Sequence, residues 1–272
     1  MSDEAAGWRN PVRERVRRGE PVFGITLTTP SLEIAARAAR VGFDFLWVEM
    51  EHSPVTLETL RHIVLATRGL PAVPFARVPT NELWTAKRVL DQGAHGVIFP
   101  FTRTPDMARQ AVAACRYPPV GLRGCGAGAA ITTWCDPVLD ADRYYDSADE
   151  HVMVVAMIED AAAVEQVDEI AATPGLDVLF IGTADLSFSL GHRGRQEPKA
   201  VQDAIERVRR AAEKHGKIAG RPAGSPARVK DAIAQGFRFF QVSSDVNFFE
   251  AGARQFLDPL DRRPAPTTRG VY

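Results

Sequence analysis

Titratable side chains gather at the end of one strand-like run, LWVEMEH, which occupies residues 46–52. The run begins with apolar residues and ends in Glu49, Glu51 and His52. Carboxylates and a histidine at the end of a buried strand can hold a cation or transfer a proton near neutral pH. A chain that directs such groups to the end of its own core is expected to have a functional site there.

Other apolar runs also end in polar side chains. In chain order these side chains are Arg77, Glu159, Asp185, Arg221, Ser243 and Ser244. Two carboxylates at strand ends, in a chain without a Cys/His cluster, favour a hard divalent ion such as Mg2+ or Mn2+. The alternative is structural, because Asp160 and Asp185 could each cap the following helix and His52 alone could be a structural histidine.

The elements that must position these side chains repeat between residues 22 and 250. An apolar, β-branched run is followed by a turn and then by an alanine-rich amphipathic stretch that ends at glycine. Strands are predicted at residues 22–28, 43–49, 73–77, 96–100, 152–158, 177–182, 217–221 and 238–243. Eight strands alternating with helices predict parallel βαβ units. We interpret the chain as an α/β protein with a single (β/α)8 TIM barrel, and a doubly wound open sheet is the alternative.

Domain boundaries follow from this interpretation. The barrel is assigned to residues 21–256, with an N-terminal extension or helix at 1–20 and a proline-rich, basic tail at 257–272. The segment 116–151 is too long for a plain connection, and long ordered loops in compact domains are usually functional. In a TIM barrel the active site lies at the C-terminal ends of the strands, so the polar residues above should share one rim.

Composition argues against some classes of partner. Lys+Arg 33 against Asp+Glu 34 gives a net charge of -1, which does not favour nucleic acid or an acidic membrane. No segment approaches the apolar length that spans a bilayer, and the N-terminus lacks the apolar region of a secretory signal. Cys115, Cys125 and Cys135 fit no usual zinc spacing and are expected to be free thiols in a reducing cytoplasm.

Five motifs together resemble a known family. They are GFDFLWVEMEHSP, ARVP, VLDQGAHGVIFP, RYPPVGLRG, and FIGTADLSFSLG with Glu159 ahead of it. Their order and spacing resemble those of the HpcH/HpaI aldolases, metal-dependent 2-oxoacid aldolases that include macrophomate synthase. The resemblance covers roughly residues 20–255.

The resemblance assigns roles to five side chains. It implies that Glu159 and Asp185 bind a divalent ion, such as Mg2+, Mn2+ or Co2+, with water and substrate in the remaining positions. It implies that Arg77 holds the 2-oxoacid and stabilises its enolate. His52 would be the base, and Asp91 the carboxylate that raises its basicity.

Further implications concern the substrate and the assembly. Ala184 would contact substrate through its backbone, and Arg123 lies in the RYPPVGLRG loop without a firm role. The family forms hexamers, as trimers of dimers with exchanged C-terminal helices, so neighbouring subunits are expected to complete the site. Three positions depart from the family: Glu49 replaces Asp, Thr183 replaces Pro, and Met157 replaces a substrate-contacting Gln.

The leading functional hypothesis is an aldolase that cleaves or forms a 4-hydroxy-2-oxoacid, with a small 2-oxoacid and an aldehyde or other acceptor as partners. A Schiff-base mechanism is not favoured, because no lysine lies at a predicted strand end on the rim. One alternative generates the enolate by decarboxylating oxaloacetate and adds it to a larger acceptor, as macrophomate synthase does. Another is a catalytically silent barrel that acts as a binding protein, since fold does not fix function.

Overall fold

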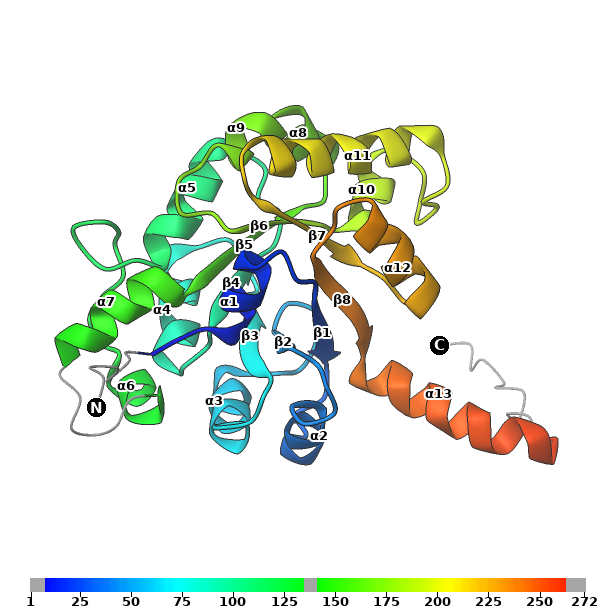
Figure 1. Cartoon of the computed structure of the whole chain (residues 1–272), viewed down its shortest axis with the longest axis horizontal. Helices are drawn as coiled ribbons and strands as arrows, with labels where there is room; N and C mark the ends of the chain where they lie inside the picture. Colours follow the sequence, from blue (N-terminus) through cyan, green and yellow to red (C-terminus); the bar gives the residue numbers. More distant parts are fainter. Residues whose placement is uncertain (1–7, 135–140, 263–272) are drawn as a thin grey trace, which may run out of the picture.

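Eight parallel strands close into one barrel surrounded by helices (Figure 1). The computed structural model describes residues 8–134 and 141–262 of the chain. The strands are β1 (Val22–Leu27), β2 (Phe45–Glu49), β3 (Val73–Arg77), β4 (Gly96–Phe99), β5 (Met153–Ile158), β6 (Val178–Ile181), β7 (Ile218–Pro222) and β8 (Phe239–Ser244). Each strand pairs with the next, and β8 pairs with β1. The predicted TIM barrel is confirmed, and the open sheet is excluded.

Helices connect the strands and cover the outside of the barrel. They are α1 (Pro11–Arg17), α2 (Leu32–Ala38), α3 (Leu57–Ala66), α4 (Leu83–Asp91), α5 (Pro105–Ala114), α6 (Gly128–Trp134), α7 (Ala141–His151), α8 (Ala161–Glu165), α9 (Val167–Ala171), α10 (Thr183–Ser189), α11 (Lys199–Lys214), α12 (Pro226–Ala234), α13 (Asp245–Leu257) and the 3₁₀ helix η1 (Asp258–Leu260). The long segment 116–151 therefore carries two helices, α6 and α7. No helix in the described ranges has the length and apolar character needed to cross a membrane.

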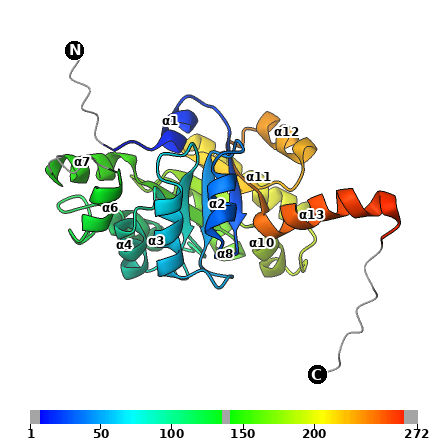
Figure 2. The same cartoon turned by 90° about the horizontal axis from the view of Figure 1, so that it is seen from below.

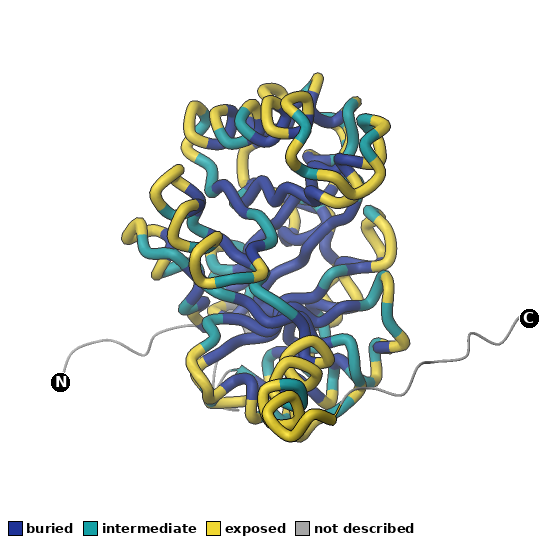
Figure 3. The backbone as a smooth tube through the Cα atoms, turned by 90° about the vertical axis from the view of Figure 1, so that its right-hand side faces the viewer, coloured by how far each residue is buried: buried dark blue, intermediate teal, exposed yellow. Residues whose placement is uncertain are grey.

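Aromatic rings fill the barrel interior. Phe45, Phe75 and Phe239 are fully buried, and the ring centroids of Phe45 and Phe239 lie 4.4 Å apart. Glycines make the room for them, because a Cβ at Gly24 would fall 2.1 Å from the Phe45 ring and a Cβ at Gly96 would fall 2.3 Å from the Phe75 ring. The strands are accordingly buried along most of their length, with half-buried positions mainly in β7 and β8 (Figure 3). They form a packed, rigid support for their C-terminal ends.

Helix α1 closes the N-terminal end of the barrel. Val12 and Val16 of α1 belong to the same apolar cluster as the residues inside the barrel. The Asn10 side chain caps α1 and also donates hydrogen bonds to the backbone carbonyls of His95 and His151, 2.9 and 3.1 Å away. The N-terminal segment thus covers the end of the barrel that lies opposite the predicted site.

Helix α13 extends away from the barrel, as both Figure 1 and Figure 2 show. Three of its aromatic side chains are exposed, Phe248, Phe249 and Phe256, and the exposed fraction of Phe249 reaches 78%. The exchange of this helix between subunits remains a prediction. The end of the predicted tail, residues 263–272, lies outside the described residues.

Candidate active site

A cavity of about 460 Å³ opens at the C-terminal ends of the strands. Its lining includes nine of the residues singled out in the sequence: Glu49, His52, Arg77, Met157, Glu159, Thr183, Ala184, Asp185 and Ser244. The barrel therefore brings together side chains that are more than a hundred residues apart in the chain. Asp91 and Arg123 do not line this cavity.

Glu49, at the end of β2, organises one wall. One carboxylate oxygen accepts hydrogen bonds from Arg77 Nε at 2.6 Å and from Trp47 Nε1 at 3.1 Å. The other oxygen accepts the backbone N–H groups of Glu51 and His52, at 2.8 and 3.0 Å. Glu49 thus holds the guanidinium of Arg77 and folds the turn that carries His52. This is the local role of Glu49, at a position where the resemblance implied an aspartate.

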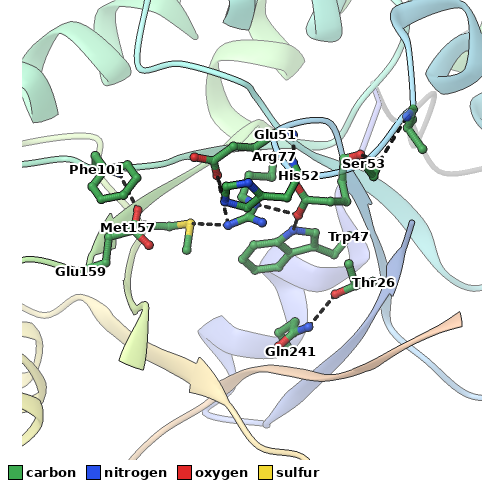
Figure 4. Close-up of polar contacts among 12 residues, drawn as sticks. Thr26, Trp47, Glu51, His52, Ser53, Arg77, Phe101, Met157, Glu159 and Gln241 are labelled. Atoms are coloured by element: carbon green, nitrogen blue, oxygen red, sulfur yellow. Dashed lines mark hydrogen bonds and ion pairs between the residues drawn. The ribbon is translucent and has the colours of Figure 1, made fainter. Parts of the chain in front are cut away.

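Arg77 is held on two sides (Figure 4). Its Nη1 lies 3.1 Å from a carboxylate oxygen of Glu51 and 3.9 Å from the sulfur of Met157, and its guanidinium carbon lies 5.8 Å from the centre of the Trp47 ring. Among the described residues, Nη2 of Arg77 has no hydrogen-bond partner. A guanidinium fixed in this way presents a preformed donor to an incoming carboxylate or keto oxygen.

His52 lies at the mouth of the cavity, with 63% of its side chain exposed. Its Nε2 is 3.6 Å from a carboxylate oxygen of Glu51, which also pairs with Arg77. Burial raises the pKa of Glu51, and the charge of Arg77 opposes that rise. Sequence reasoning gave Glu51 no role, although its place between Glu49 and His52 was a signal.

Glu159 follows β5 and is almost completely buried. Its carboxylate accepts the backbone N–H of Phe101 at 2.6 Å, and it lies so close to β6 that a Cβ at Gly182 would fall 2.4 Å from it. Burial raises the pKa of Glu159 to about 7; the Phe101 N–H opposes the rise, and the nearby charge of Asp185 adds to it. Asp185 itself is exposed in the first turn of α10.

The charges on this rim fit a divalent cation. This rim carries four carboxylates, those of Glu49, Glu51, Glu159 and Asp185, and Arg77 contacts only the first two. A bound cation would relieve the repulsion between Glu159 and Asp185 and would stabilise the charged form of Glu159. Among the residues that the structure describes, no group of three or more His, Cys, Asp or Glu forms a cage. Two carboxylates suit a hard ion that keeps water or substrate in its other positions.

Of the two aspartates that could have capped a helix instead of binding a metal, only one does so. Asp160 caps α8, accepting the backbone N–H of Ala163 at 2.8 Å. Helix α10 begins after Gly182 without a side-chain cap, so Asp185 has no capping role there. No lysine is found among the described residues that line the cavity.

Asp91 and Arg123 lie elsewhere in the barrel. Asp91 is the last residue of α4, and helices of a TIM barrel run opposite to the strands, so it lies near the N-terminal ends of the strands. There it pairs with Arg123 at 3.2 Å, and Arg123 lies over the ring of Tyr117 at 4.6 Å. The expectation that Asp91 supports His52 is therefore not met within a single chain.

The model of the HpcH/HpaI aldolase/citrate lyase family matches residues 25–251. The chain belongs to this family. It is accordingly an enzyme of the aldolase kind, a carbon–carbon lyase, and HpcH/HpaI aldolases are generally dependent on divalent metals.

Several HpcH/HpaI relatives match over most of their length. A hydroxypyruvate/pyruvate aldolase of Paraburkholderia phytofirmans is 38% identical, covering 92% of this chain and 97% of the relative. A 5-keto-4-deoxy-D-glucarate aldolase of Shigella dysenteriae is 36% identical over 81% and 85% of the two chains. The solved structure of a family protein from Burkholderia cenocepacia has 35% identity and a TM-score of 0.84, covering 93% of this chain and 100% of that one. Macrophomate synthase, at 23% identity and a TM-score of 0.77, shares the fold.

Proposed function

We propose that this enzyme cleaves or forms 4-hydroxy-2-oxoacids through a pyruvate-type enolate, with a divalent ion held by Glu159 and Asp185. One observation carries the proposal: two carboxylates and a guanidinium with a free donor edge line a single cavity. When bound, Mg2+, Mn2+ or Co2+ supplies positive charge beside the keto oxygen, where negative charge develops as a C3 proton or the C3–C4 bond is lost.

Arg77 binds and orients the 2-oxoacid. Its Nη2 edge is available to the substrate, while Glu49 and Glu51 fix the rest of the guanidinium. A donor that is already in place needs no rearrangement as charge develops on the enolate oxygen. The backbone of Ala184, which lines the same cavity, is assigned to substrate contact. Trp47 and Phe180 provide apolar surface in the same cavity, which limits water around the reacting atoms.

His52 moves the proton of the aldol hydroxyl. Its imidazole lies at the mouth of the cavity, where an aldehyde would enter, and imidazole commonly serves as a general acid or base in enzymes. In the cleavage direction His52 accepts the proton of the 4-hydroxyl as the C3–C4 bond breaks. In the synthetic direction it returns that proton to the new alkoxide.

We also propose that the enzyme is a cytoplasmic hexamer in which Asp91 of one subunit supports His52 of another. The position of Asp91 at the far end of the barrel and the exposed aromatic face of α13 support an intersubunit arrangement. Co-expression of His52→Ala and Asp91→Ala chains tests it, because mixed hexamers would regain activity that neither variant has alone. Mixed hexamers that remain as inactive as the parents would refute the shared site.

Exchange of the pyruvate methyl protons tests the central proposal. Proton NMR in D2O with Mg2+, Mn2+ or Co2+ should show loss of the methyl signal, because enolate formation does not require the acceptor. Metal binding without exchange would instead favour a silent barrel. Oxaloacetate loss, measured with and without an aldehyde, separates aldol chemistry from a decarboxylating reaction.

A further inference from the structure

Two polar side chains meet on the β1–β8 side of the active-site cavity, and neither has a part in the reaction described above. Gln241 of β8 donates a hydrogen bond from Nε2 to the hydroxyl oxygen of Thr26 on β1, at 2.7 Å. Both residues line the cavity. In Figure 4 they lie on the other side of the Trp47 ring from Arg77. We call these two residues the Thr26–Gln241 pair.

The strands direct both side chains into the barrel. Thr26 follows Gly24 by two residues, and Gly24 faces the interior, because a Cβ there would fall 2.1 Å from the Phe45 ring. Gln241 follows Phe239 by two residues, and Phe239 belongs to the cluster inside the barrel. Side chains alternate along a strand, so the pair lies next to the aromatic layer, toward the C-terminal ends of the strands. It therefore forms part of the floor of the cavity.

An irregularity in β8 brings a further polar side chain to this wall. Gly24 of β1 pairs with Gln241, but the next residue, Ile25, pairs with Ser243, so β8 has one extra residue there. A bulge of this kind changes the direction of the side chains that follow it. Ser244 accordingly lines the active-site cavity, and Ser243 lies outside it.

The wall that β1, β7 and β8 contribute to the cavity is polar but uncharged among the described residues. Asp245 begins the helix after β8, and its carboxylate accepts hydrogen bonds from the backbone N–H and hydroxyl groups of Thr28 and Thr29, at 2.6 to 3.2 Å. Arg221 of β7 is not among the residues that line the cavity. A charged part of the substrate would therefore find no counterion on this wall.

The pair keeps hydrogen-bonding groups that no described residue satisfies. The Thr26 hydroxyl accepts from Gln241 and still has its own proton, and the Gln241 amide still has its carbonyl oxygen and one N–H. If the amide were turned over, the pair would again offer a donor and an acceptor. An apolar group packed against the pair would leave these groups without partners, which is unfavourable. A hydroxyl, which both donates and accepts, would satisfy them.

The pair also lies across the cavity from the proposed metal site. In the closed order of eight strands, β5 is four strands away from β1 in either direction. Glu159 directly follows β5, so it lies on the wall opposite Thr26. A 2-oxoacid anchored at Glu159 and Arg77 occupies one side of the cavity. The pair borders the side that remains for the rest of the substrate.

We propose that the Thr26–Gln241 pair determines specificity by binding a neutral hydroxyl group of the substrate, separate from the 4-hydroxyl that His52 serves. This hydroxyl is carried by C3 of the 2-oxoacid or by the carbon next to the aldehyde group of the acceptor. The chemistry that the pair recognises is the same in both cases. The inference rests on the proposed function, since it needs a 2-oxoacid anchored at the metal site and Arg77.

Two pairs of substrates that differ by one hydroxyl test the inference. Hydroxypyruvate is compared with pyruvate as the donor, with acetaldehyde as the common acceptor. Glycolaldehyde is compared with acetaldehyde as the acceptor, with pyruvate as the common donor. Intrinsic reactivity differs within each pair but is the same for every variant, so the measured quantity is the change in the kcat/KM ratio on substitution. A fall in the first ratio assigns the hydroxyl to the donor, and a fall in the second assigns it to the acceptor.

Three variants connect these ratios to the pair. Gln241→Leu removes the amide and Thr26→Val removes the hydroxyl, each with little change in size. Each should lower one of the two ratios about three- to tenfold, the contribution of a hydrogen bond between neutral groups, and either variant suffices if the other does not fold. Thr26→Ser keeps the hydroxyl and should retain most of the preference. The control is Gln110→Leu, at an exposed position of α5, which should leave both ratios unchanged.

The proposed function and this inference fail in different ways. Absence of pyruvate methyl exchange in the unmodified enzyme would refute the proposed function. Normal exchange, with both ratios unchanged in Gln241→Leu and Thr26→Val, would overturn the inference alone. An equal loss of kcat/KM for the hydroxylated and non-hydroxylated substrates would also overturn it, because the pair would then only pack the first strand against the last.

Discussion

The two ends of the barrel are built from the same eight strands but differ in whether their charged side chains are paired. At the N-terminal end, Arg13 pairs with Asp177 at 2.5 Å, and Asp177 also accepts the backbone N–H of Val154 at 2.8 Å. Arg123 and Asp91 form another pair at that end. At the C-terminal end carboxylates outnumber cations, and donors point into a cavity. Matched charges stabilise the fold, whereas unmatched charges leave a place for a metal ion and a substrate.

The difference extends to the histidines. His95 is fully enclosed at the N-terminal end, with ring centroids 4.8 Å from Trp8 and 4.4 Å from Trp134. His52 at the other end is largely exposed and lies beside a carboxylate. Histidine thus packs among aromatic rings at one end, and at the other it lies where the proposed mechanism needs a proton-transfer group.

Removing either carboxylate of the proposed metal site should have the largest effect. Glu159→Gln or Asp185→Asn should abolish metal-dependent activity and leave the fold intact, because a hard cation needs charged oxygen ligands. Activity assays with and without metal measure the loss of metal-dependent activity, and calorimetric titration measures the loss of metal binding. Asp177→Asn at the opposite end is the control, since it should lower stability and keep metal dependence. Activity that survives both site variants and EDTA would remove the metal hypothesis.

His52→Ala should lower turnover roughly 10²–10⁴-fold while metal affinity changes little. The reason is that His52 is assigned to proton transfer and not to metal binding. Steady-state kinetics and metal calorimetry on the same preparation separate these effects. Loss of metal binding in this variant would make His52 a ligand.

Arg77→Lys should reduce kcat about 10²–10³-fold, or about 2.7–4 kcal/mol, although the charge is kept. An ammonium cannot contact Glu49 and Glu51 and still present a planar edge to substrate. Arg13→Lys provides the matched change at the N-terminal end and should affect stability only. Kinetics close to those of the unmodified enzyme would show that Arg77 is structural.

Most of the fold was predictable because strand patterns and strand ends are local in sequence. Apolar runs located all eight strands, and the barrel rule placed Glu49, Arg77, Glu159 and Asp185 on one rim. The position of Asp91 was not anticipated, because its assignment came from a family motif without regard to the direction of its helix.

Two further features depend on packing that the sequence does not reveal. The bridge that Glu51 forms between Arg77 and His52 depends on how Glu49 folds the turn. The hydrogen bond between Gln241 and Thr26 joins the last strand to the first, and no local pattern shows it.

The buried side chain of His95 should make the folded protein less stable at acid pH. Burial lowers the pKa of His95 to about 3 from a usual value of 6.5. Between these two pH values the unfolded chain binds a proton at His95 and the folded chain does not. Stability is therefore greatest above pH 6.5 and falls as the pH decreases toward 3, by about 3 kcal/mol from this group at pH 4. Urea unfolding at several pH values measures it, and His95→Leu should lose less stability on acidification. Parallel pH curves for the two proteins would contradict this.

Met157→Gln should produce the smallest change, a shift in substrate preference. We hypothesise that Met157 adapts the site to a bulkier or less polar substrate, because a thioether replaces an amide with a donor and a strong acceptor. The glutamine amide should strengthen the binding of small hydroxyaldehydes by roughly 1–3 kcal/mol, and it should weaken the binding of larger apolar acceptors. The measurement is kcat/KM of both proteins with both kinds of acceptor. Equal kcat/KM values for the two proteins would mean that Met157 only packs against its neighbours.

The pairing of β1 with β8 has a consequence for synthesis of the chain. β1 is the first strand to leave the ribosome, and one of its two neighbours in the barrel is the last. Until β8 emerges, β1 presents a row of unpaired backbone groups, and such an edge invites pairing with other chains. Barrel closure therefore waits for β8, and a chain that stops before residue 239 leaves that edge open.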